Sequence, residues 1–318
     1  MPQRTPHSTR LAMDRIGFIG LGRMGRPMAS NLRKKGFELL VHDVNPEPVK
    51  VLAQLGAKAA GSAAEVIKDS DILVTMLPSS VEVEAVALGA DGLLAHGRAG
   101  QLLMDMSTID PAATERIAQT LAAKGIAMVD APVGRLAAHA DRGESLFMVG
   151  GAEADFRRIR PLLDAMGTTI HHCGPVGTGG KTKLVNNYIC VVLCQMNAEA
   201  LALAQKFGLD LEQTLEVLNG TTATNGQLKI NWPNKVLAGD ISPGFTIDLA
   251  HKDLSLALAA GQAAKLPLAL GATTREMMNL ARAGDFGQSD FSGLLDYLCE
   301  AASIEKPRLK TAKSKAAE

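Results

Sequence analysis

A glycine-rich segment between an apolar run and an amphipathic run constrains this chain more than any other feature. Residues 16–20 read Ile-Gly-Phe-Ile-Gly, and residues 20–25 continue Gly-Leu-Gly-Arg-Met-Gly, the pattern G-x-G-x-x-G. Residues 24–35 then show helical spacing and precede Gly36, a residue type common at helix C-termini. The first glycine of the pattern makes a tight turn, the second lets the backbone approach a pyrophosphate, and the third lets the helix pack on the strand. We therefore predict a dinucleotide bound at the helix N-terminus.

An acidic residue after the next apolar run supports this prediction. Asp43 follows Leu39-Leu40-Val41-His42 and stands 18 residues after Gly25, where a carboxylate would bind the adenine-ribose hydroxyls. A carboxylate repels a 2′-phosphate, and the residues that follow directly are Val44 and Asn45, not arginine. We therefore expect NAD(H) rather than NADP(H). The alternatives are a glycine turn in an unrelated α/β protein and Asp43 as a simple strand-end cap.

Short apolar runs alternate with helical segments through the first half of the chain. Strands are predicted at 16–20, 39–41, 72–77, 102–106, 127–130, 146–150 and 169–171, and helices at 24–35, 49–55, 111–124 and 154–166. This alternation is typical of an α/β fold with a Rossmann-type, doubly wound parallel sheet.

The pattern changes near residue 176, where strands give way to helices. One long helical segment, 179–207, is followed by shorter ones at 211–218, 248–264, 272–283 and 291–302. We expect a flexible leader over 1–14, a dinucleotide-binding domain over 15–176, an all-α domain over 177–305 that begins with a long interdomain helix, and a disordered tail over 306–318.

Composition excludes several classes of protein. The 318 residues carry 33 basic and 33 acidic side chains, whereas nucleic-acid binders usually have a basic surplus. No run of about 18 uninterrupted apolar residues is present, so we expect no membrane span. The four cysteines lack zinc-site spacing, and the adjacent His171 and His172 would point to opposite faces of a strand. We expect a cytoplasmic protein with no metal, no nucleic-acid partner and no membrane partner.

Four motifs in a fixed order carry a family resemblance. They are residues 17–25, residues 130–133 (Asp-Ala-Pro-Val, completed by Gly143 and 148–151), residues 177–187 (Gly-Thr-Gly-Gly-Lys-Thr-Lys-Leu-Val-Asn-Asn) and Lys252-Asp253-Leu254. With them the chain resembles the β-hydroxyacid dehydrogenase family, of which 3-hydroxyisobutyrate dehydrogenase is a member, over about residues 15–305. The resemblance implies an NAD(H)-dependent oxidoreductase acting on a small anionic hydroxy or aldehyde substrate, and a homodimer or homotetramer.

The third motif supplies the candidate for proton transfer. Reduction of an aldehyde develops negative charge on the carbonyl oxygen, so a proton donor must stand within about 3 Å of it. Lys183 is the candidate acid and base, and Asn187, one helical turn later on the same face, would orient the ammonium or bind the substrate hydroxyl. Lys181, on another face, is a weaker candidate. For both Lys183 and Lys181, the alternative is a lysine at the protein surface with no part in proton transfer.

The resemblance implies further contacts. Cofactor contacts are expected from Gly20, Leu21, Gly22, Arg23, Met24, Gly25, Asp43, Leu77, Thr108 and Lys252. Substrate contacts are expected from Ser107, Gly134, Arg135, Asn186, Asn187, Tyr188, Ile189 and Cys190. Ordinary loop packing is the alternative for Leu77 and Thr108.

One departure from the family pattern bears on the substrate. Most of the family continues Asp-Ala-Pro-Val with Ser-Gly-Gly, but this chain continues with Gly134-Arg135-Leu136. With residues 186–188 and 232–237, this variant resembles a branch that reduces 3-sulfolactaldehyde with NADH to 2,3-dihydroxypropane-1-sulfonate. A guanidinium matches a three-oxygen anion, so we expect Arg135 to bind the sulfonate.

Three alternatives stay open at this point. Arg135 pairs with a nearby carboxylate, Asp141 or Glu144. The substrate is a carboxylate, namely tartronate, methylmalonate or succinic semialdehyde. The chain is a non-catalytic dinucleotide-binding module.

Overall fold

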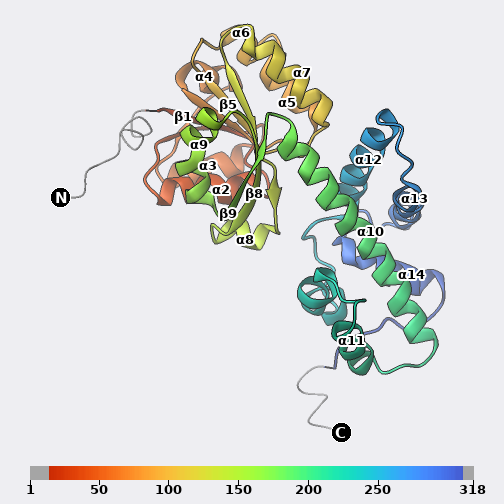
Figure 1. Cartoon of the computed structure of the whole chain (residues 1–318). Helices are drawn as coiled ribbons and strands as arrows, with labels where there is room; N and C mark the ends of the chain where they lie inside the picture. Colours follow the sequence, from red (N-terminus) through yellow and green to blue (C-terminus); the bar gives the residue numbers. More distant parts are fainter. Residues whose placement is uncertain (1–13, 311–318) are drawn as a thin grey trace. The chain divides into compact units, whose positions relative to one another are not determined.

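The structure, a computed structural model, describes residues 14–310 and comprises two compact units that divide between Lys183 and Leu184 (Figure 1). We call them the sheet unit and the helical unit and describe each by itself. The sequence places the boundary near residue 176. The structure places it later because the first turn of helix α10 (Thr178–Lys206) is bonded to the sheet unit.

The sheet unit contains a nine-stranded sheet of order β3-β2-β1-β4-β5-β6-β8-β7, with β9 paired to β8. Its strands are β1 (Ile16–Ile19), β2 (Leu39–His42), β3 (Lys58–Ala59), β4 (Ile72–Thr75), β5 (Leu102–Asp105), β6 (Ala127–Asp130), β7 (Val133–Gly134), β8 (Ser145–Gly150) and β9 (Gly167–Gly174). Strand β1 pairs in parallel with β2 on one side and with β4 on the other. The strand order reverses there, and doubly wound sheets bind ligands at the carboxyl ends of the strands at such a point.

The predicted fold class is confirmed, but the sheet is not wholly parallel. Strand β8 runs antiparallel to β6 and β7 and parallel to β9. Asp130, the last residue of β6, pairs with Gly150, the last residue of β8. This junction lies next to the start of α10.

Eight helices accompany the described strands of the sheet unit. They are α2 (Gly25–Lys34), α3 (Pro46–Gln54), α4 (Ala63–Asp69), α5 (Ser80–Leu88), α6 (Leu93–His96), α7 (Pro111–Ala122), α8 (Ala137–Asp141) and α9 (Glu153–Met166). Helix α3 begins three residues before the predicted Val49, because Asn45 accepts the Glu47 N–H and Pro46 fits the first helical position.

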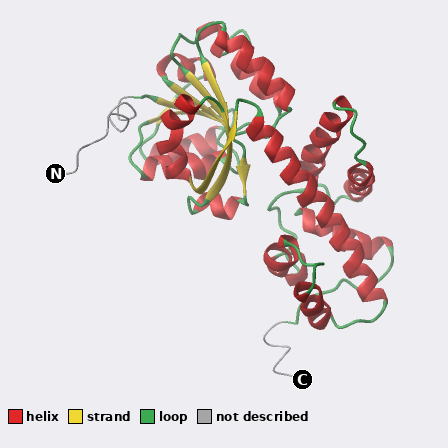
Figure 2. Cartoon of the chain, viewed as in Figure 1, coloured by secondary structure: helices red, strands yellow, loops and turns green. Residues whose placement is uncertain are grey.

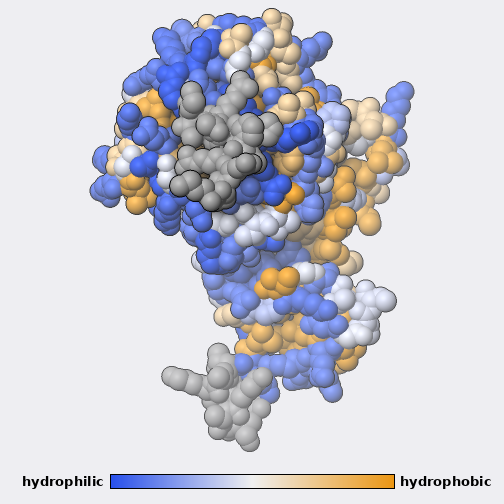
Figure 3. All heavy atoms as spheres, turned by 60° about the vertical axis from the view of Figure 1, so that its left-hand side comes forward, coloured by the Kyte–Doolittle hydropathy of each residue, from blue (hydrophilic) through white to orange (hydrophobic). Residues whose placement is uncertain are grey.

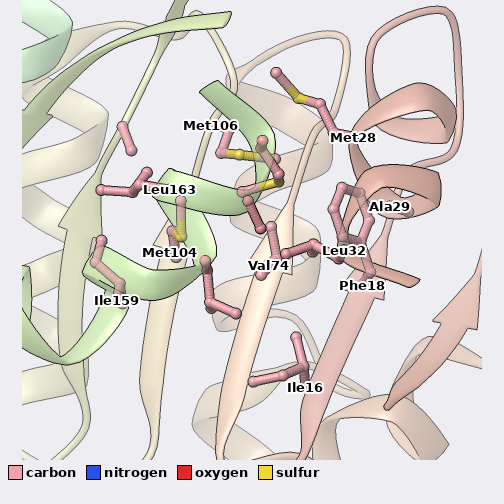
Figure 4. Close-up of a cluster of buried hydrophobic side chains, with 14 of the residues drawn as sticks. Ile16, Phe18, Met28, Ala29, Leu32, Val74, Met104, Met106, Ile159 and Leu163 are labelled. Atoms are coloured by element: carbon pink, nitrogen blue, oxygen red, sulfur yellow. The ribbon is translucent and has the colours of Figure 1, made fainter. Parts of the chain in front are cut away.

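Two apolar cores cover the two faces of the sheet, because successive side chains of a buried strand point to opposite faces. Val74 and Met104 belong to one core, and their neighbours Leu73 and Leu103 to the other. Figure 4 shows the first core, where Phe18, Val74 and Met104 lie with side chains from α2 and α9. A sheet covered on both faces leaves its strand ends for ligands.

The helical unit consists of helices packed around one face of α10 (Figure 2). They are α11 (Leu211–Gly220), α12 (Ile247–Ala263), α13 (Ala269–Ala283) and α14 (Leu294–Ala301), with short helical turns at 227–231, 232–234, 236–238 and 291–293. Val191, Cys194, Ala198 and Leu201 recur at helical spacing on α10 and are buried. They form the core with Trp232 and residues of the other helices.

Within residues 14–310, α10 is the one helix long and apolar enough to cross a membrane by length and composition. Its most apolar stretch has a mean hydropathy of 1.3, and half of that stretch is buried inside the protein. A core helix passes the same test. The buried stripe just described accounts for the buried half of this stretch.

The predictions for the two chain ends need correction. Asp14, expected in the flexible leader, pairs with Arg158 at 3.1 Å. Residues 306–310, expected in the disordered tail, are held in place. Arg308 bonds both carboxylate oxygens of Asp296, at 2.8 and 2.7 Å, and the Leu309 N–H donates to the Leu237 carbonyl. Residues 1–13 and 311–318 lie outside the described residues, so their predicted flexibility stays a prediction.

Candidate active site

The glycine-rich loop after β1 has the geometry that a dinucleotide requires. Gly20 has φ +94°, and a Cβ there would lie 2.3 Å from the Met76 carbonyl oxygen. A Cβ on Gly25 would lie 1.9 Å from the Gly20 oxygen, so the helix start and the loop touch backbone to backbone. Gly22 is exposed, with nothing within 4 Å of the place of its Cβ. The middle glycine therefore leaves room for a pyrophosphate, as predicted for this pattern.

Helix α2 begins without a side chain that caps its N-terminus. Met24 makes no capping bond, and the first turn contains no acidic residue. The N-terminal N–H groups of a helix favour an anion, so this end suits a phosphate. Arg23, like Gly22, is exposed at this end. Leu21 is buried and packs in the core that includes Phe18 and Met28.

Asp43 lies against the same loop. Its Oδ2 accepts the Leu21 N–H at 2.5 Å, and its Oδ1 accepts the Asn45 N–H at 2.7 Å. Each carboxylate oxygen accepts more than one hydrogen bond, so ribose hydroxyls can add to these contacts. The residues present thus fit NAD(H): glycines for the pyrophosphate and a half-buried carboxylate for the ribose.

The loops after β4 and β5 are tied together at the same edge of the sheet. The Leu77 N–H donates to Ser107 Oγ at 2.9 Å, and that hydroxyl donates to Asp105 Oδ1 at 2.6 Å. Thr75 donates to the same Asp105 oxygen at 2.8 Å. The structure therefore brings Leu77 and Ser107 together, with half-buried Thr108 beside them in the chain. The Ser107 hydroxyl serves to join the two loops.

Lys183 lies near the start of α10 and contacts β7. Its Nζ donates to the Val133 carbonyl oxygen at 2.7 Å, and the side chain is half-buried. Lys181 instead forms an exposed ion pair with Glu115, Nζ to Oε1 2.6 Å. The two lysines thus differ as predicted for residues on different helical faces: one is held by a buried strand, and the other pairs at the surface.

A buried carboxylate precedes β7. Asp130 Oδ1 accepts the Gly177 N–H at 2.6 Å, and Oδ2 accepts the Gly180 N–H at 2.7 Å. Burial raises the pKa of Asp130 to about 6, although these backbone N–H groups act in the opposite direction. Sequence reasoning placed Asp130 only in a substrate-binding motif and missed these bonds. Two features of the sequence could have indicated these bonds. Asp130 ends a predicted strand, and the long helix begins with the glycine-rich residues 177–180.

In the helical unit, another buried carboxylate joins two predicted site residues. Asn187 Nδ2 donates to Asp253 Oδ2 at 2.5 Å, and Lys252 Nζ lies 3.1 Å from Asp253 Oδ1. Asn186 Nδ2 donates to Asn187 Oδ1 at 2.9 Å. Asp253 is 3% exposed, so its carboxylate is held by these partners and orients them. The motif Lys252-Asp253-Leu254 contains Asp253, but the sequence alone predicted no role for it.

The residues after Asn187 point in different directions. The Tyr188 hydroxyl accepts the Gly271 N–H of α13 at 3.3 Å, and Cys190 Sγ accepts a bond from Gln227 at 2.9 Å. Ile189 is exposed. Successive residues of a helix are about 100° apart, so the five consecutive residues 186–190 cannot all line one surface. The structure groups Asn186 and Asn187 and separates them from Tyr188, Ile189 and Cys190.

Arg135 is held by oxygens of the sheet unit. It has φ +71°, and its Nη1 donates to the Glu144 carbonyl at 2.6 Å and to Thr168 Oγ1 at 3.1 Å. Its Nη2 donates to Thr169 Oγ1 at 3.0 Å. The Glu144 carboxylate pairs with Arg142, so Arg135 contacts a carbonyl there and not a carboxylate. The preceding Gly134 is buried opposite Leu146.

The described residues 14–310 contain no group of three or more His, Cys, Asp or Glu side chains that could hold a metal ion. All four cysteines, at positions 173, 190, 194 and 299, are free thiols. The candidate groups for binding and chemistry are the glycine loop, Lys183, the Asn186 and Asn187 amides of α10 and the carboxylates of Asp43, Asp130 and Asp253.

Comparison with known proteins matches both units. Residues 15–174 match the NAD binding domain of 6-phosphogluconate dehydrogenase, and residues 177–298 match the NAD-binding domain of NADP-dependent 3-hydroxyisobutyrate dehydrogenase. The chain is 41% identical to 3-sulfolactaldehyde reductase of Escherichia coli over 292 residues, which cover 92% of this chain and 98% of the relative.

Other relatives are nearly as similar. The chain is 39% identical over 290 residues to 3-hydroxyisobutyrate dehydrogenase of Pseudomonas aeruginosa, covering 89% of this chain and 97% of the relative. A solved structure of 3-hydroxyisobutyrate dehydrogenase from Mycobacterium tuberculosis with L-serine superposes with a TM-score of 0.83 at 32% identity, covering 90% and 99% of the two chains. The likeness thus extends through nearly all of each relative.

Proposed function

This chain belongs to the 3-hydroxyisobutyrate dehydrogenase-like family of β-hydroxyacid dehydrogenases, and we propose that within it the chain reduces 3-sulfolactaldehyde with NADH to 2,3-dihydroxypropane-1-sulfonate, reversibly. The family assignment makes it an NAD-dependent oxidoreductase that uses NAD(H). The substrate is the proposal. The observation that carries it is the 41% identity to the E. coli enzyme along 92% of this chain.

NADH, when bound, supplies the hydride for the aldehyde carbon, and the protein supplies position and a proton. The glycine loop and α2 would hold the pyrophosphate, and Asp43 the adenine ribose. The Lys183 ammonium would stabilise the negative charge that develops on the carbonyl oxygen and then give it a proton. In the opposite direction the neutral amine would accept that proton.

The fixed neighbours of Lys183 and Asn187 support these roles. The Val133 carbonyl holds the Lys183 ammonium at 2.7 Å, and the buried Asp253 carboxylate holds the Asn187 amide at 2.5 Å. A catalytic group gains most when its geometry is set before the substrate arrives. Lys183→Ala is therefore expected to remove turnover and to leave NADH binding nearly intact.

Arg135 is the residue we propose for the sulfonate. It stands two positions after Val133, so the segment that begins with β7 and holds the Lys183 ammonium also carries a guanidinium. A guanidinium has five N–H donors, and the observed partners are a carbonyl and two threonine hydroxyls at the surface. An oxyanion would replace one or more of these neutral partners, and charge-assisted bonds are the stronger ones.

A carboxylate substrate is the second candidate. The 39% identity to the P. aeruginosa 3-hydroxyisobutyrate dehydrogenase is close to the 41% identity to the sulfolactaldehyde enzyme. NADH absorbance, followed with 3-sulfolactaldehyde and with tartronate, methylmalonate and succinic semialdehyde, separates the two. The proposal expects the highest kcat/KM with the sulfonate. A higher value with any of the carboxylates would replace it.

A non-catalytic dinucleotide-binding module is the candidate from another class. It would bind NADH and turn over none of these aldehydes. The presence of Lys183 and Asn187, each held by a protein acceptor, supports an enzyme.

We also propose that the chain forms a homodimer or homotetramer. Exposed apolar residues recur along α10 at Val185, Ile189, Met196 and Leu203, and Phe207 follows directly after the end of the helix. Figure 3 shows apolar side chains gathered on the surface of the protein. A stripe of exposed apolar residues along one helix, as on α10, is typical of a helix that contacts another subunit. Light scattering on a sizing column tests this, and a single-chain mass would contradict it.

A cytoplasmic location, with no nucleic-acid or membrane partner, remains part of the same proposal.

A further inference from the structure

We propose that Asp130 is a positioning residue for Lys183: its carboxylate anchors the N-terminus of α10, the helix that carries Lys183, to the end of β6. The inference rests on the proposed function for the role of Lys183. It differs from the expectation that residues 130–133 bind substrate. Asp130 is 3% exposed and both its oxygens accept backbone N–H groups, so its carboxylate is committed to the helix.

The first observation is the bonding at the start of α10. A helix leaves four N–H groups at its start without intrahelical partners. Here the Thr178 N–H donates to the Pro175 carbonyl, and the Gly177 and Gly180 N–H groups donate to Asp130. A negative charge is also favourable at the positive end of the helix dipole. Bonds of 2.6 and 2.7 Å to a carboxylate away from water are strong.

The second observation is the close contact between backbones at this point. A Cβ on Gly179 would lie 2.3 Å from the Met148 carbonyl oxygen and 2.9 Å from the Asp130 carbonyl oxygen. A Cβ on Gly150 would lie 2.5 Å from Asp130 Oδ1 and 2.8 Å from the Gly179 nitrogen. Only glycine fits at both positions. The first turn of α10 therefore rests directly on β6 and β8, with no flexible side chain between them.

The third observation is that one short segment holds both the helix and the ammonium. Asp130 bonds the backbone at Gly177 and Gly180, and Val133, three residues later, bonds Lys183 Nζ at 2.7 Å. Lys183 itself is three residues after Gly180. A shift of the helix start would therefore move the ammonium relative to the strand that holds it. A misplacement of about 1 Å can cost about 100-fold in rate.

The test begins with Asp130→Asn, which puts an amide N–H₂ against one of the two backbone N–H groups. We expect kcat to fall about 10- to 100-fold. The KM and Kd for NADH should change less than about twofold, because the variant does not touch the glycine loop. Amide hydrogen exchange over residues 177–183 should become faster. Asp210→Asn is the matched control, because Asp210 caps α11 in the helical unit. It should leave kcat unchanged.

A second pair of variants keeps the Asp130 carboxylate. One variant shifts the start of α10, and the other is its control. Gly179→Ala forces the 2.3 Å contact with Met148 and should reproduce the fall in kcat. Gly180→Ala, whose Cβ would lie 3.6 Å from Asp130 Oδ2, makes an ordinary contact and should lose less. This pair decides the question if Asp130→Asn does not fold.

The inference is overturned if Asp130→Asn and Gly179→Ala keep kcat within about twofold of the wild type, even with a lower melting temperature. Such a result would make Asp130 a residue of stability alone. Unchanged exchange over residues 177–183 in Asp130→Asn would also overturn it. Failure of the proposed function looks different, since the wild type would then prefer a carboxylate substrate or turn over none of the aldehydes. The exchange experiment does not depend on turnover.

Discussion

The pH dependence of stability at Asp130 is the sharpest prediction of the structure. Burial raises the pKa of this carboxyl from 3.8 to about 6, and the neighbouring charge of Asp105 on β5 adds to the rise. The N–H groups of Gly177 and Gly180 oppose it. Because the pKa is raised in the folded state, the folded protein binds a proton more tightly than the unfolded chain between pH 3.8 and about 6.

The sign and size of the effect follow from linkage. Folded-state stability from this group is full below pH 3.8 and decreases as the pH rises to about 6, above which it is constant. A difference of about 2 pKa units corresponds to about 3 kcal/mol in the free energy of unfolding. An amide in place of the carboxyl cannot titrate, so Asp130→Asn removes this dependence.

The assay is urea unfolding of the wild type and of Asp130→Asn from about pH 4 to about pH 7, followed by circular dichroism. We expect the stability of the wild type relative to the variant to fall by about 2.4 kcal/mol across this range, because the rest of the change lies below pH 4. Carboxylates that do not interact with Asp130 titrate equally in both proteins and cancel in the difference. A difference that stays constant, or that grows with pH, would refute the reasoning, because it would mean that the two N–H bonds balance or outweigh burial.

Four further outcomes are expected. Lys183→Ala should abolish aldehyde reduction and keep NADH binding, measured by NADH fluorescence titration; retained turnover would remove Lys183 from the mechanism. Arg135→Ala should lose about 1.5–3 kcal/mol of transition-state binding, or about 10- to 150-fold in kcat/KM, with 3-sulfolactaldehyde and less with succinic semialdehyde. Equal losses on the two substrates would contradict sulfonate binding. Because Asp43 repels a 2′-phosphate, kcat/KM should be higher for NADH than for NADPH, and the reverse order would show that Asp43 does not select the cofactor. Asp253→Ala should release the Asn187 amide and lower kcat, and a full-rate variant would show that Asn187 needs no such support.

Local patterns were enough to predict the cofactor loop and most of the elements. Buried strands such as Ile72–Thr75 appear as short apolar runs, and the turn at Gly20 needs a positive φ that glycine tolerates. The i,i+4 spacing of Lys183 and Asn187 is a property of the helix alone. The two-residue strands β3 and β7 were missed, because so short a segment has no periodicity to read.

Helix boundaries shifted where capping, and not periodicity, determines the first residue. Helix α3 begins at Pro46, three residues before its predicted start, because the Asn45 side chain caps it. The chain ends are another case. Residues 306–310 have the composition of a tail, and their order comes from Asp296, Leu237 and Glu212, which lie far away in the sequence.

By itself, the sequence determined the Rossmann-type sheet, the glycine loop, the acidic residue after β2 and the lysine on α10, because each depends on backbone conformation or on spacing within one element. Only the tertiary structure decided which partners Asp130, Arg135 and Asp253 take. Asp130 meets amides 47 and 50 residues away, and Asp253 an amide 66 residues away. Such contacts form because a buried carboxylate must find donors wherever the fold brings them, and a chain carries no local pattern for a partner that distant.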